Sequence, residues 1–405
     1  MERRGYDGNA ILVGSVAKGT HLKNPDIDIF LRFPKELNRE ELKKLGIEIG
    51  RSILPEGFAK YAEHPYWRGV YNGFDVDIVP CYMIDSPDEK LSAVDRTPFH
   101  TEYVKKNLKV EQRDEVRLLK AFLKGIGAYG AEAKIQGFSG YLTELLILKY
   151  GNFTGALENV SRWRRRVYLY LEEKGEKFHA PVVFIDPVDK SRNAASAVSE
   201  EKKSLFIYAS QSYLNHPRLE FFFPRDIVPL RREEIIKRVT GRGTHFYVLT
   251  LPKPDIIEDN LYPQIKRSLD VFLKILQDFH PVSSFFVVQD VVHFIIEVER
   301  NKLPRVRRHE GPPIWTDNSK DFLERWRGKA IRGPYIIGHR WYVDAERKYI
   351  TVEEVLYANI SNYKLGKSFE KMKDKIKIRK LENCINEIDA VSLTDFFDFK
   401  FPWER

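Results

Sequence analysis

Two carboxylates two residues apart, Asp26 and Asp28, lie a short loop after a Gly14-Ser15 pair. If residues 26–33 form a strand, both carboxylates lie on one face, because side chains two apart point the same way. Such neighbours repel each other unless a cation lies between them. Oxygen ligands suit a hard ion such as Mg²⁺, which commonly bridges carboxylates to substrate phosphates. The N–H groups of a Gly14-Ser15 turn could hold those phosphates. The combination indicates nucleotidyl transfer.

A second acidic strand is expected at 74–80, where Asp75 and Asp77 share a face. Three carboxylates from two adjacent strands can hold two metal ions, one activating a 3′-hydroxyl and one stabilising a pyrophosphate leaving group. The structural alternative is that these aspartates only solvate the outer faces of edge strands. The glycine-serine pair upstream and the repeated acidic pattern favour a metal site. Its expected ligands are Asp26, Asp28 and Asp77.

The elements that must position these residues fall into three expected domains, 1–107, 108–240 and 241–405, of class α+β. In the first, strands are expected at 10–13, 26–33, 58–63, 67–71 and 74–80, with a helix at 40–52. Asn72-Gly73 between two apolar runs is a hairpin turn signal. The first domain is therefore expected to be a strand-rich unit that presents the acidic residues.

The second and third expected domains differ in pattern. In 108–240, apolar residues three and four apart predict helices at 111–123, 137–149 and 153–171. In 241–405, a strand (246–251), a helix (261–279) and a strand pair (284–288 and 291–297) are typical of a ferredoxin-like module. A further helix is expected at 356–380. The central domain is thus expected to be helical and the last one α+β.

Composition limits the partners and the setting. The 405 residues carry 67 Lys and Arg against 58 Asp and Glu, a formal charge of +9 that suits a polyanionic partner without proving one. No apolar run approaches the roughly 20 residues that span a bilayer, and the first residues do not form a signal peptide. Only Cys81 and Cys384 are present, which favours a reducing, cytoplasmic setting without membrane attachment.

Several ordered motifs carry a resemblance to a known family. They are GSVAKGT at 14–20, YAEHPY at 61–66, DIVPCY at 77–82, DRTPFH at 95–100, GFSGY at 137–141 and DPVD at 186–189. The acidic pattern resembles the polymerase-β-like nucleotidyltransferase superfamily, and the full series is similar to the archaeal, class I CCA-adding tRNA nucleotidyltransferases. The resemblance implies a nucleotidyltransferase palm, a helical central domain that binds nucleotide and tRNA, and a C-terminal ferredoxin-like body with a tail.

The resemblance also implies residue roles. Asp26, Asp28 and Asp77 match the family's metal ligands, for two Mg²⁺ ions, although the first is often Glu. The proton acceptor stays open between Asp77 and a metal-bound hydroxide. The residues implied to bind the incoming nucleotide are Ser15, Lys18, His64, Arg96, Thr97, Lys120, Tyr129 and Arg192, of which Arg192 matches the arginine that reads the base together with tRNA phosphates.

These nucleotide-binding assignments depend on the resemblance. Taken alone, a mid-helix lysine is usually solvated, and a lone tyrosine or histidine usually serves packing. Members of the family carry helices before the first strand, whereas only residues 1–9 precede Ala10. We expect either a naturally short start or a start downstream of the true one, with reduced support for the first strand.

Two basic clusters are candidate RNA-binding surfaces. The first contains Arg162, Arg164, Arg165 and Arg166 around Trp163, and fits a phosphate-contacting helix face. The second contains Arg300, Lys302, Arg305, Arg307, Arg308 and His309. A charge run is more often a solvated face, but the net positive charge and an RNA partner favour binding, with Arg305, Arg307 and Arg308 as the candidate contacts in the second cluster.

The leading hypothesis is a Mg²⁺-dependent enzyme that adds C, C and A to the tRNA acceptor end from CTP and ATP without a nucleic-acid template. The alternatives are a poly(A) or uridylyl polymerase, an oligoadenylate synthetase-like enzyme, and a non-catalytic RNA-binding protein. The intact acidic triad disfavours the last. The sequence does not decide the oligomeric state, and a homodimer is one expectation.

Overall fold

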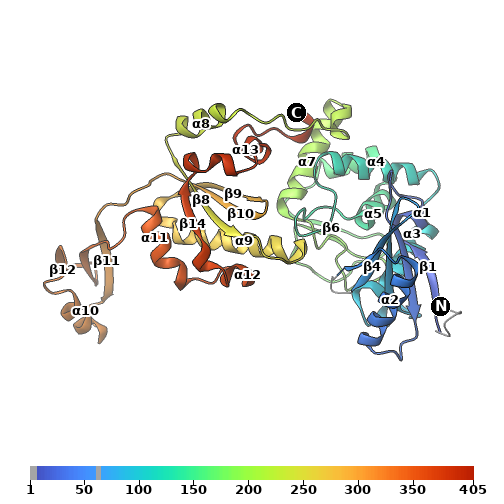
Figure 1. Ribbon diagram of the computed structural model, residues 1–405, viewed down its shortest axis with the longest axis horizontal. Coiled ribbons are helices and arrows are strands. Elements are labelled where there is room, and N and C mark those ends of the chain that lie inside the picture. Colours follow the sequence, from blue (N-terminus) through green and yellow to red (C-terminus); the bar gives the residue numbers. More distant parts are fainter. Residues whose placement is uncertain (1–6, 61–64) are drawn as a thin grey trace. The chain divides into compact units, whose positions relative to one another are not determined.

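The computed structural model describes residues 7–60 and 65–405. The chain divides into two compact units, one of residues 1–226 with Lys400–Arg405 and one of Ile227–Phe399. Both units mix helices and strands, which confirms the expected α+β class with several parts (Figure 1). The division into three domains at 107 and 240 stays a prediction. No helix in the described part of the chain combines the length and apolar character needed to cross a membrane.

A five-stranded sheet opens the first unit (Figure 1, blue). Its spatial order is β1 (Asn9–Val13), β2 (Ile27–Phe33), β5 (Phe74–Tyr82), β4 (Tyr66–Tyr71) and β3 (Phe58–Lys60). β2 and β5 run parallel, and the other neighbours are antiparallel. Helix α2 (Arg39–Ile53) starts at an Asn38 capping box and buries Leu42 and Ile49 in the core shared with this sheet. The expected palm strands are confirmed, apart from residues 61–63, which lie outside the described residues.

The predicted hairpin turn is also confirmed. Asn72 and Gly73 both adopt positive φ angles, as a tight two-residue hairpin turn requires. The turn joins β4 to β5 and sets their register, which pairs Tyr71 with Phe74 and, three residues along, Arg68 with Asp77. The turn therefore places a basic side chain opposite one of the candidate metal ligands.

The rest of the first unit is mainly helical. It contains α3 (Thr97–Asn107), α4 (Gln112–Gly125), α5 (Gly140–Tyr150), α6 (Phe153–Val160) and α7 (Glu200–Asn215), with the parallel pair β6 (Val167–Leu169) and β7 (Val182–Phe184). These elements share one core, in which Phe122, Phe138 and Phe206 are fully buried. The predicted helices at 111–123 and 137–149 are confirmed, although α5 starts at Gly140, after the Ser139 N-cap.

The predicted helix at 153–171 is wrong beyond Val160. Residues 167–169 form strand β6, because their backbone pairs with β7 and Val167 is buried in the core. Arg162, Arg164, Arg165 and Arg166 therefore lie in the connection between α6 and β6 and not on a helix face. Trp163 is buried in the same core and anchors this connection.

The second unit contains a four-stranded antiparallel sheet with the order β14 (Lys377–Lys380), β8 (His245–Pro252), β10 (Val291–Val298) and β9 (Pro281–Val288). Helix α9 (Glu258–Ile275) joins β8 to β9 and shares their core through Ile265 and Phe272. The run β8-α9-β9-β10 confirms the predicted ferredoxin-like order. On the sheet's other face, α8 (Arg232–Gly241) and α13 (Ala390–Phe397) share a core with Phe246 and Ile295.

The predicted helix at 356–380 is wrong. The region contains the last part of α11 (Val352–Asn359), the short helix α12 (Lys367–Glu370) and strand β14, which pairs with β8 along Lys377–Lys380. Available edge hydrogen bonds on β8 thus override the local helical pattern. Sequence analysis also missed a three-stranded sheet, β11 (Val306–Pro313), β13 (Arg340–Glu346) and β12 (Arg332–Ile337), which packs with α10 (Asn318–Trp326).

Candidate active site

The acidic residues meet where β2 and β5 lie side by side. Asp28 of β2 and Asp77 of β5 are register partners on these parallel strands, and Asp26 lies two residues before Asp28. The turn between β1 and helix α1 (Gly14–Lys18) passes directly over Asp28. Gly14 has a φ of +72°, and a Cβ added there would lie 2.0 Å from Oδ2 of Asp28. Only glycine therefore fits at this position, because the turn lies directly against the carboxylate.

Arg68 is a site residue that sequence analysis missed. Its Nε donates a hydrogen bond to Oδ1 of Asp77 at 2.7 Å, and its Nη2 lies 3.0 Å from Oδ1 of Asp26. One guanidinium thus neutralises two of the three candidate ligands. The signal was present in the sequence, because counting back from the Asn72-Gly73 turn places Arg68 opposite Asp77.

The electrostatics of the carboxylates fit a cation. Burial, followed by the charges of Asp77 and Asp26, raises the pKa of Asp28 to about 6. Burial also raises the pKa of Asp77, against the opposing charge and hydrogen bond of Arg68. A hard divalent ion would relieve this repulsion, and the donor set is all oxygen. As the described side chains stand, however, no three His, Cys, Asp or Glu residues among them are arranged to hold an ion.

Lys18 and Lys120 meet at a buried carboxylate that sequence analysis missed, Glu144 on α5. Lys18 Nζ lies 2.5 Å from Oε2 of Glu144, and Lys120 Nζ lies 3.4 Å from Oε1. Thr20 donates its hydroxyl to Oε1 at 2.5 Å, and its carbonyl accepts from Lys120 at 3.0 Å. Burial lowers the pKa of Lys120, against the opposing charge of Glu144. Both lysines are buried here, inside the protein rather than facing solvent.

Two other predicted nucleotide-binding residues, Ser15 and Tyr129, lie near this network. Ser15 is half-buried in the first turn of α1. The Tyr129 hydroxyl lies 3.0 Å, and Lys120 Nζ 3.6 Å, from the point where a Cβ on Gly140 would be, so both groups approach the start of α5. Burial raises the pKa of Tyr129 to about 12. His64 lies outside the described residues.

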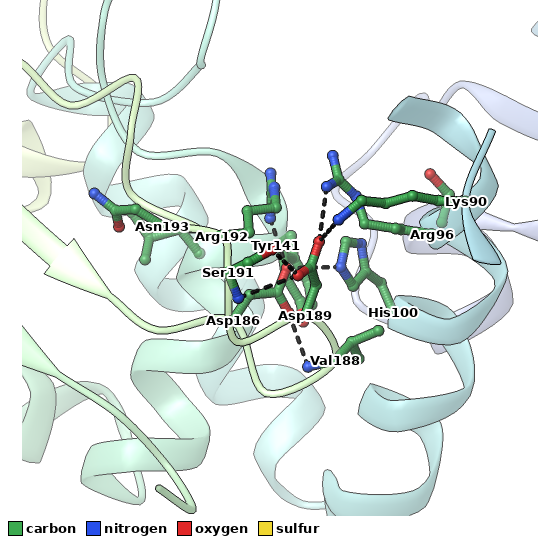
Figure 2. Close-up of polar contacts among 12 residues, drawn as sticks. Lys90, Arg96, His100, Tyr141, Asp186, Val188, Asp189, Ser191, Arg192 and Asn193 are labelled. Atoms are coloured by element: carbon green, nitrogen blue, oxygen red, sulfur yellow. Dashed lines mark hydrogen bonds and ion pairs between the residues drawn. The ribbon is translucent and has the colours of Figure 1, made fainter. Parts of the chain in front are cut away.

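A second buried carboxylate, Asp186, contacts Arg192, His100 of α3 and Tyr141 of α5 (Figure 2). Arg192 Nη1 and His100 Nε2 each lie 2.8 Å from Oδ2, and the Tyr141 hydroxyl donates to Oδ1 at 2.9 Å. The His100 and Tyr141 rings stack with centroids 4.1 Å apart. Burial alone would raise the pKa of Asp186, but His100 and Arg192 outweigh it and lower the pKa to about 2.

Asp189 lies in the same loop and binds the segment before α3. It is 2.5 Å from Lys90 Nζ and 2.9 Å from Arg96 Nη1, and it accepts a hydrogen bond from the Ser191 hydroxyl at 2.6 Å. Thr97 follows Arg96 as the first residue of α3. The loop 186–192 therefore links the predicted base-reading residue to the predicted phosphate-side segment (Figure 2). The DPVD motif at 186–189 contains both aspartates, but the sequence alone indicated no role for either of them.

The basic clusters are exposed. Arg162, Arg164, Arg165 and Arg166 have no acidic partner among the residues that the structure describes, and two of them line a hollow of about 520 Å³ in the first unit. In the second unit, Arg307 and Arg308 lie on β11, with Arg305 just before it. A pocket of about 370 Å³ beside this strand is lined by the cations Lys274, Arg307, Arg347 and Lys348. Both surfaces present positive charge, as an RNA-binding role requires.

Comparison with known families agrees with this geometry. The palm, residues 1–100, matches the family described as "Nucleotidyltransferase domain", so fold and acidic site define a nucleotidyltransferase. Residues 114–223 match "tRNA nucleotidyltransferase, second domain", and residues 242–380 match "CCA-adding enzyme, C-terminal domain".

Curated relatives extend the match over nearly the whole chain. The CCA-adding enzyme of Thermoplasma volcanium is 43% identical, over 93% of this chain and 85% of its own length. Those of Picrophilus torridus and Archaeoglobus fulgidus are 41% and 38% identical, over 95% and 96% of this chain and 88% and 90% of their own lengths. The chain belongs to the family of CCA-adding enzymes, as its sequence motifs predicted.

Proposed function

We propose that this protein adds C, C and A to the 3′ end of tRNA, taking the nucleotides from CTP and ATP without a nucleic-acid template. The observation that carries the proposal is the pairing of Asp28 with Asp77 on parallel strands beneath the Gly14 turn. Family membership over more than nine-tenths of the chain supports the tRNA substrate. The tRNA 3′-hydroxyl would attack the α-phosphate of the nucleotide, and pyrophosphate would leave.

Nucleotidyltransferases of this superfamily use divalent metal ions. We propose two Mg²⁺ ions held by Asp26, Asp28 and Asp77, which would polarise the attacking hydroxyl and offset charge on the leaving group. Arg68 contacts both Asp26 and Asp77, so its guanidinium offsets their negative charge, and bound metal ions would offset the same charge. The crowded carboxylates and the raised pKa of Asp28 support this assignment.

For the triphosphate we propose contacts from Ser15, Lys18, Lys120, Arg96 and Thr97. Lys18 and Lys120 are bound to Glu144, so phosphate oxygens would compete with that carboxylate for the same two ammonium groups. Tyr129, beside Lys120, would contact the ribose. His64 stays a predicted nucleotide contact.

For the base we propose Arg192. A guanidinium offers five N–H donors, and cytosine N3 and adenine N1 are acceptors where uracil N3 and guanine N1 carry hydrogens. Arg192 is 31% exposed and has one side-chain partner within the described residues, Asp186, which leaves further donors for a base edge. Phosphates of the bound tRNA would supply the remaining recognition.

The exposed arginines of both units are our candidates for holding the tRNA acceptor end and stem. A homodimer stays a prediction, as does a cytoplasmic setting. The cytoplasmic prediction depends on the two cysteines, Cys81 and Cys384, which are buried and form no disulfide.

The alternatives are a poly(A) or uridylyl polymerase, an oligoadenylate synthetase-like enzyme and a silent RNA-binding protein. One assay separates them: a tRNA transcript ending at the discriminator base is incubated with each nucleotide and with mixtures, and products are sequenced. The proposal expects C, C and A in that order and then no extension. Homopolymeric tails would favour a polymerase, and no pyrophosphate release with any nucleotide would favour the silent protein.

A further inference from the structure

Asp186 is fully buried, and protein donors fix its position. Oδ1 accepts from the Tyr141 hydroxyl at 2.9 Å and from the backbone N–H of Val188 at 3.0 Å, and Oδ2 lies 2.8 Å from His100 Nε2. Tyr141 belongs to α5 and His100 to α3, so side chains from two helices hold the carboxylate (Figure 2). A carboxylate held in this way is a rigid reference point.

Arg192 depends on that reference point. Its Nη1 donates to Oδ2 of Asp186 at 2.8 Å, and its carbonyl accepts from the Asp186 N–H at 3.1 Å. No other side-chain hydrogen bond of Arg192 occurs within residues 7–60 and 65–405. Because a guanidinium is planar and rigid, fixing one nitrogen restricts the direction of all its donors. Asp186 therefore controls where the remaining N–H groups of Arg192 point.

The loop that carries both residues is itself held in place. The Asp189 side chain is only 3% exposed and binds Lys90 and Arg96, so the backbone between Asp186 and Arg192 is fixed at its middle. The Arg192 N–H also donates to the Asp189 carbonyl at 2.9 Å. Movement of Arg192 is thereby limited to its side chain, whose single anchor among the described residues is Asp186.

We propose that Asp186 is a specificity-determining positioning residue, which holds the Arg192 guanidinium so that its remaining N–H groups meet an acceptor edge of the incoming base. The inference rests on the proposed function. A guanidinium fixed in this way favours cytosine and adenine, which present an acceptor, over uracil and guanine, which present a hydrogen at the same ring position. An unanchored Arg192 would turn toward the carbonyl oxygens of uracil, so discrimination would fall more than the rate with CTP.

A purely structural role for Asp186 predicts something different. If it only joined α3, α5 and the loop, its loss would reduce the folded fraction and would lower turnover with CTP and UTP by the same factor. The ratio of the two rates is therefore the informative quantity, because it does not depend on how much enzyme is folded.

The test uses the full chain and a tRNA transcript ending at the discriminator base. The kcat/KM for addition of a single nucleotide is measured with CTP and with UTP. The proteins compared are the wild type, Asp186→Asn, Arg192→Ala and the double variant. Loss of a charged hydrogen bond corresponds to roughly a tenfold or larger change, so we expect Asp186→Asn to lower the CTP-to-UTP ratio by about that factor. In the Arg192→Ala background, Asp186→Asn should change the ratio no further.

Two further variants complete the design. Tyr141→Phe keeps the ring that stacks on His100 and removes only the hydroxyl donor to Asp186, so it should lower the same ratio by a smaller factor. Glu173→Gln removes an exposed ion pair with Lys190 of the same loop and should leave the ratio unchanged.

The outcomes separate the two claims. An unchanged ratio in Asp186→Asn, or, where that variant does not fold, in Tyr141→Phe, would overturn the inference while the proposed function stands. The inference would also be overturned if the effects of Asp186→Asn and Arg192→Ala on the CTP-to-UTP ratio were additive in the double variant. A wild-type chain that adds neither nucleotide would overturn the proposed function, and the inference with it.

Discussion

Arg68 and Asp77 are direct partners across the β4–β5 hairpin, with Arg68 Nε 2.7 Å from Oδ1 of Asp77. The same guanidinium reaches Asp26 at 3.0 Å, so one cationic side chain lies against two candidate metal ligands. The contact explains how three carboxylates tolerate close approach in the protein alone. If Asp26 and Asp77 hold metal ions as proposed, those ions and Arg68 would act on the same charges.

Replacing Arg68 should make stability depend on divalent ions. In Arg68→Gln the two carboxylates lose their counter-charge, and we expect a loss of about 1–3 kcal/mol in the free energy of unfolding without metal. Added Mg²⁺ should restore more stability to the variant than to the wild type, because the ion replaces the guanidinium. Thermal unfolding with EDTA and with Mg²⁺ measures both. Lys35→Gln, at an exposed pair with Glu89, is the control. Equal Mg²⁺ effects in variant and wild type would contradict the account.

Glu144 should stabilise the fold by neutralising two buried lysines. Glu144→Gln leaves Lys18 and Lys120 buried without their carboxylate, and we expect a destabilisation of about 3 kcal/mol. If both lysines bind phosphate, pyrophosphate should raise the melting temperature of the variant more than that of the wild type. Glu40→Gln, at a surface pair with Lys43, should be nearly neutral. A variant as stable as the wild type would show that the buried charges do not need Glu144.

The buried Asp186 should contribute to acid sensitivity. Its pKa is lowered to about 2 in the folded protein from an ordinary value of 3.8, so the unfolded chain binds its proton first as pH falls. Stability from this group is thus fully present above about pH 5 and is lost as pH falls toward 2. Between pH 5 and pH 3 the loss is about 1 kcal/mol. Urea unfolding at both pH values should show a smaller loss in Asp186→Asn. An identical loss in both proteins would refute this.

The arginines at the start of β11 should anchor RNA through phosphates. Replacing Arg305, Arg307 and Arg308 together by Ala should weaken tRNA binding and make it less sensitive to salt. The slope of the logarithm of the binding constant against the logarithm of the salt concentration should become shallower by roughly 0.7–0.9 for each phosphate that is no longer bound. Turnover at saturating tRNA should stay unchanged. Arg332→Ala in the same small sheet is the matched control, because Asp344 lies 3.8 Å from that guanidinium. An unchanged slope in the triple variant would exclude these arginines from the RNA interface.

Local patterns predicted much of the palm, but contacts distant in sequence did not follow from them. Alternation and the Asn72-Gly73 turn predicted the strands and the β4–β5 hairpin, since these depend on periods of two and on a short turn. The register that pairs Asp28 with Asp77 on the parallel strands β2 and β5 did not follow from them. The hairpin register could also have revealed Arg68. Glu144 could not be found in this way, because 126 residues separate it from Lys18. The wrong helix predictions at 153–171 and 356–380 share one cause. Residues with helical spacing of apolar side chains instead form strands, because their backbones pair with β7 and β8.

Nucleotide addition by the wild type and by Asp28→Ala, on a tRNA ending at the discriminator base, tests the central claim most directly. We expect the wild type to add C, C and A, and Asp28→Ala to add nothing although its fold and tRNA affinity stay close to those of the wild type. Circular dichroism and filter binding measure these two controls. Incorporation by Asp28→Ala at a rate near that of the wild type would contradict the account.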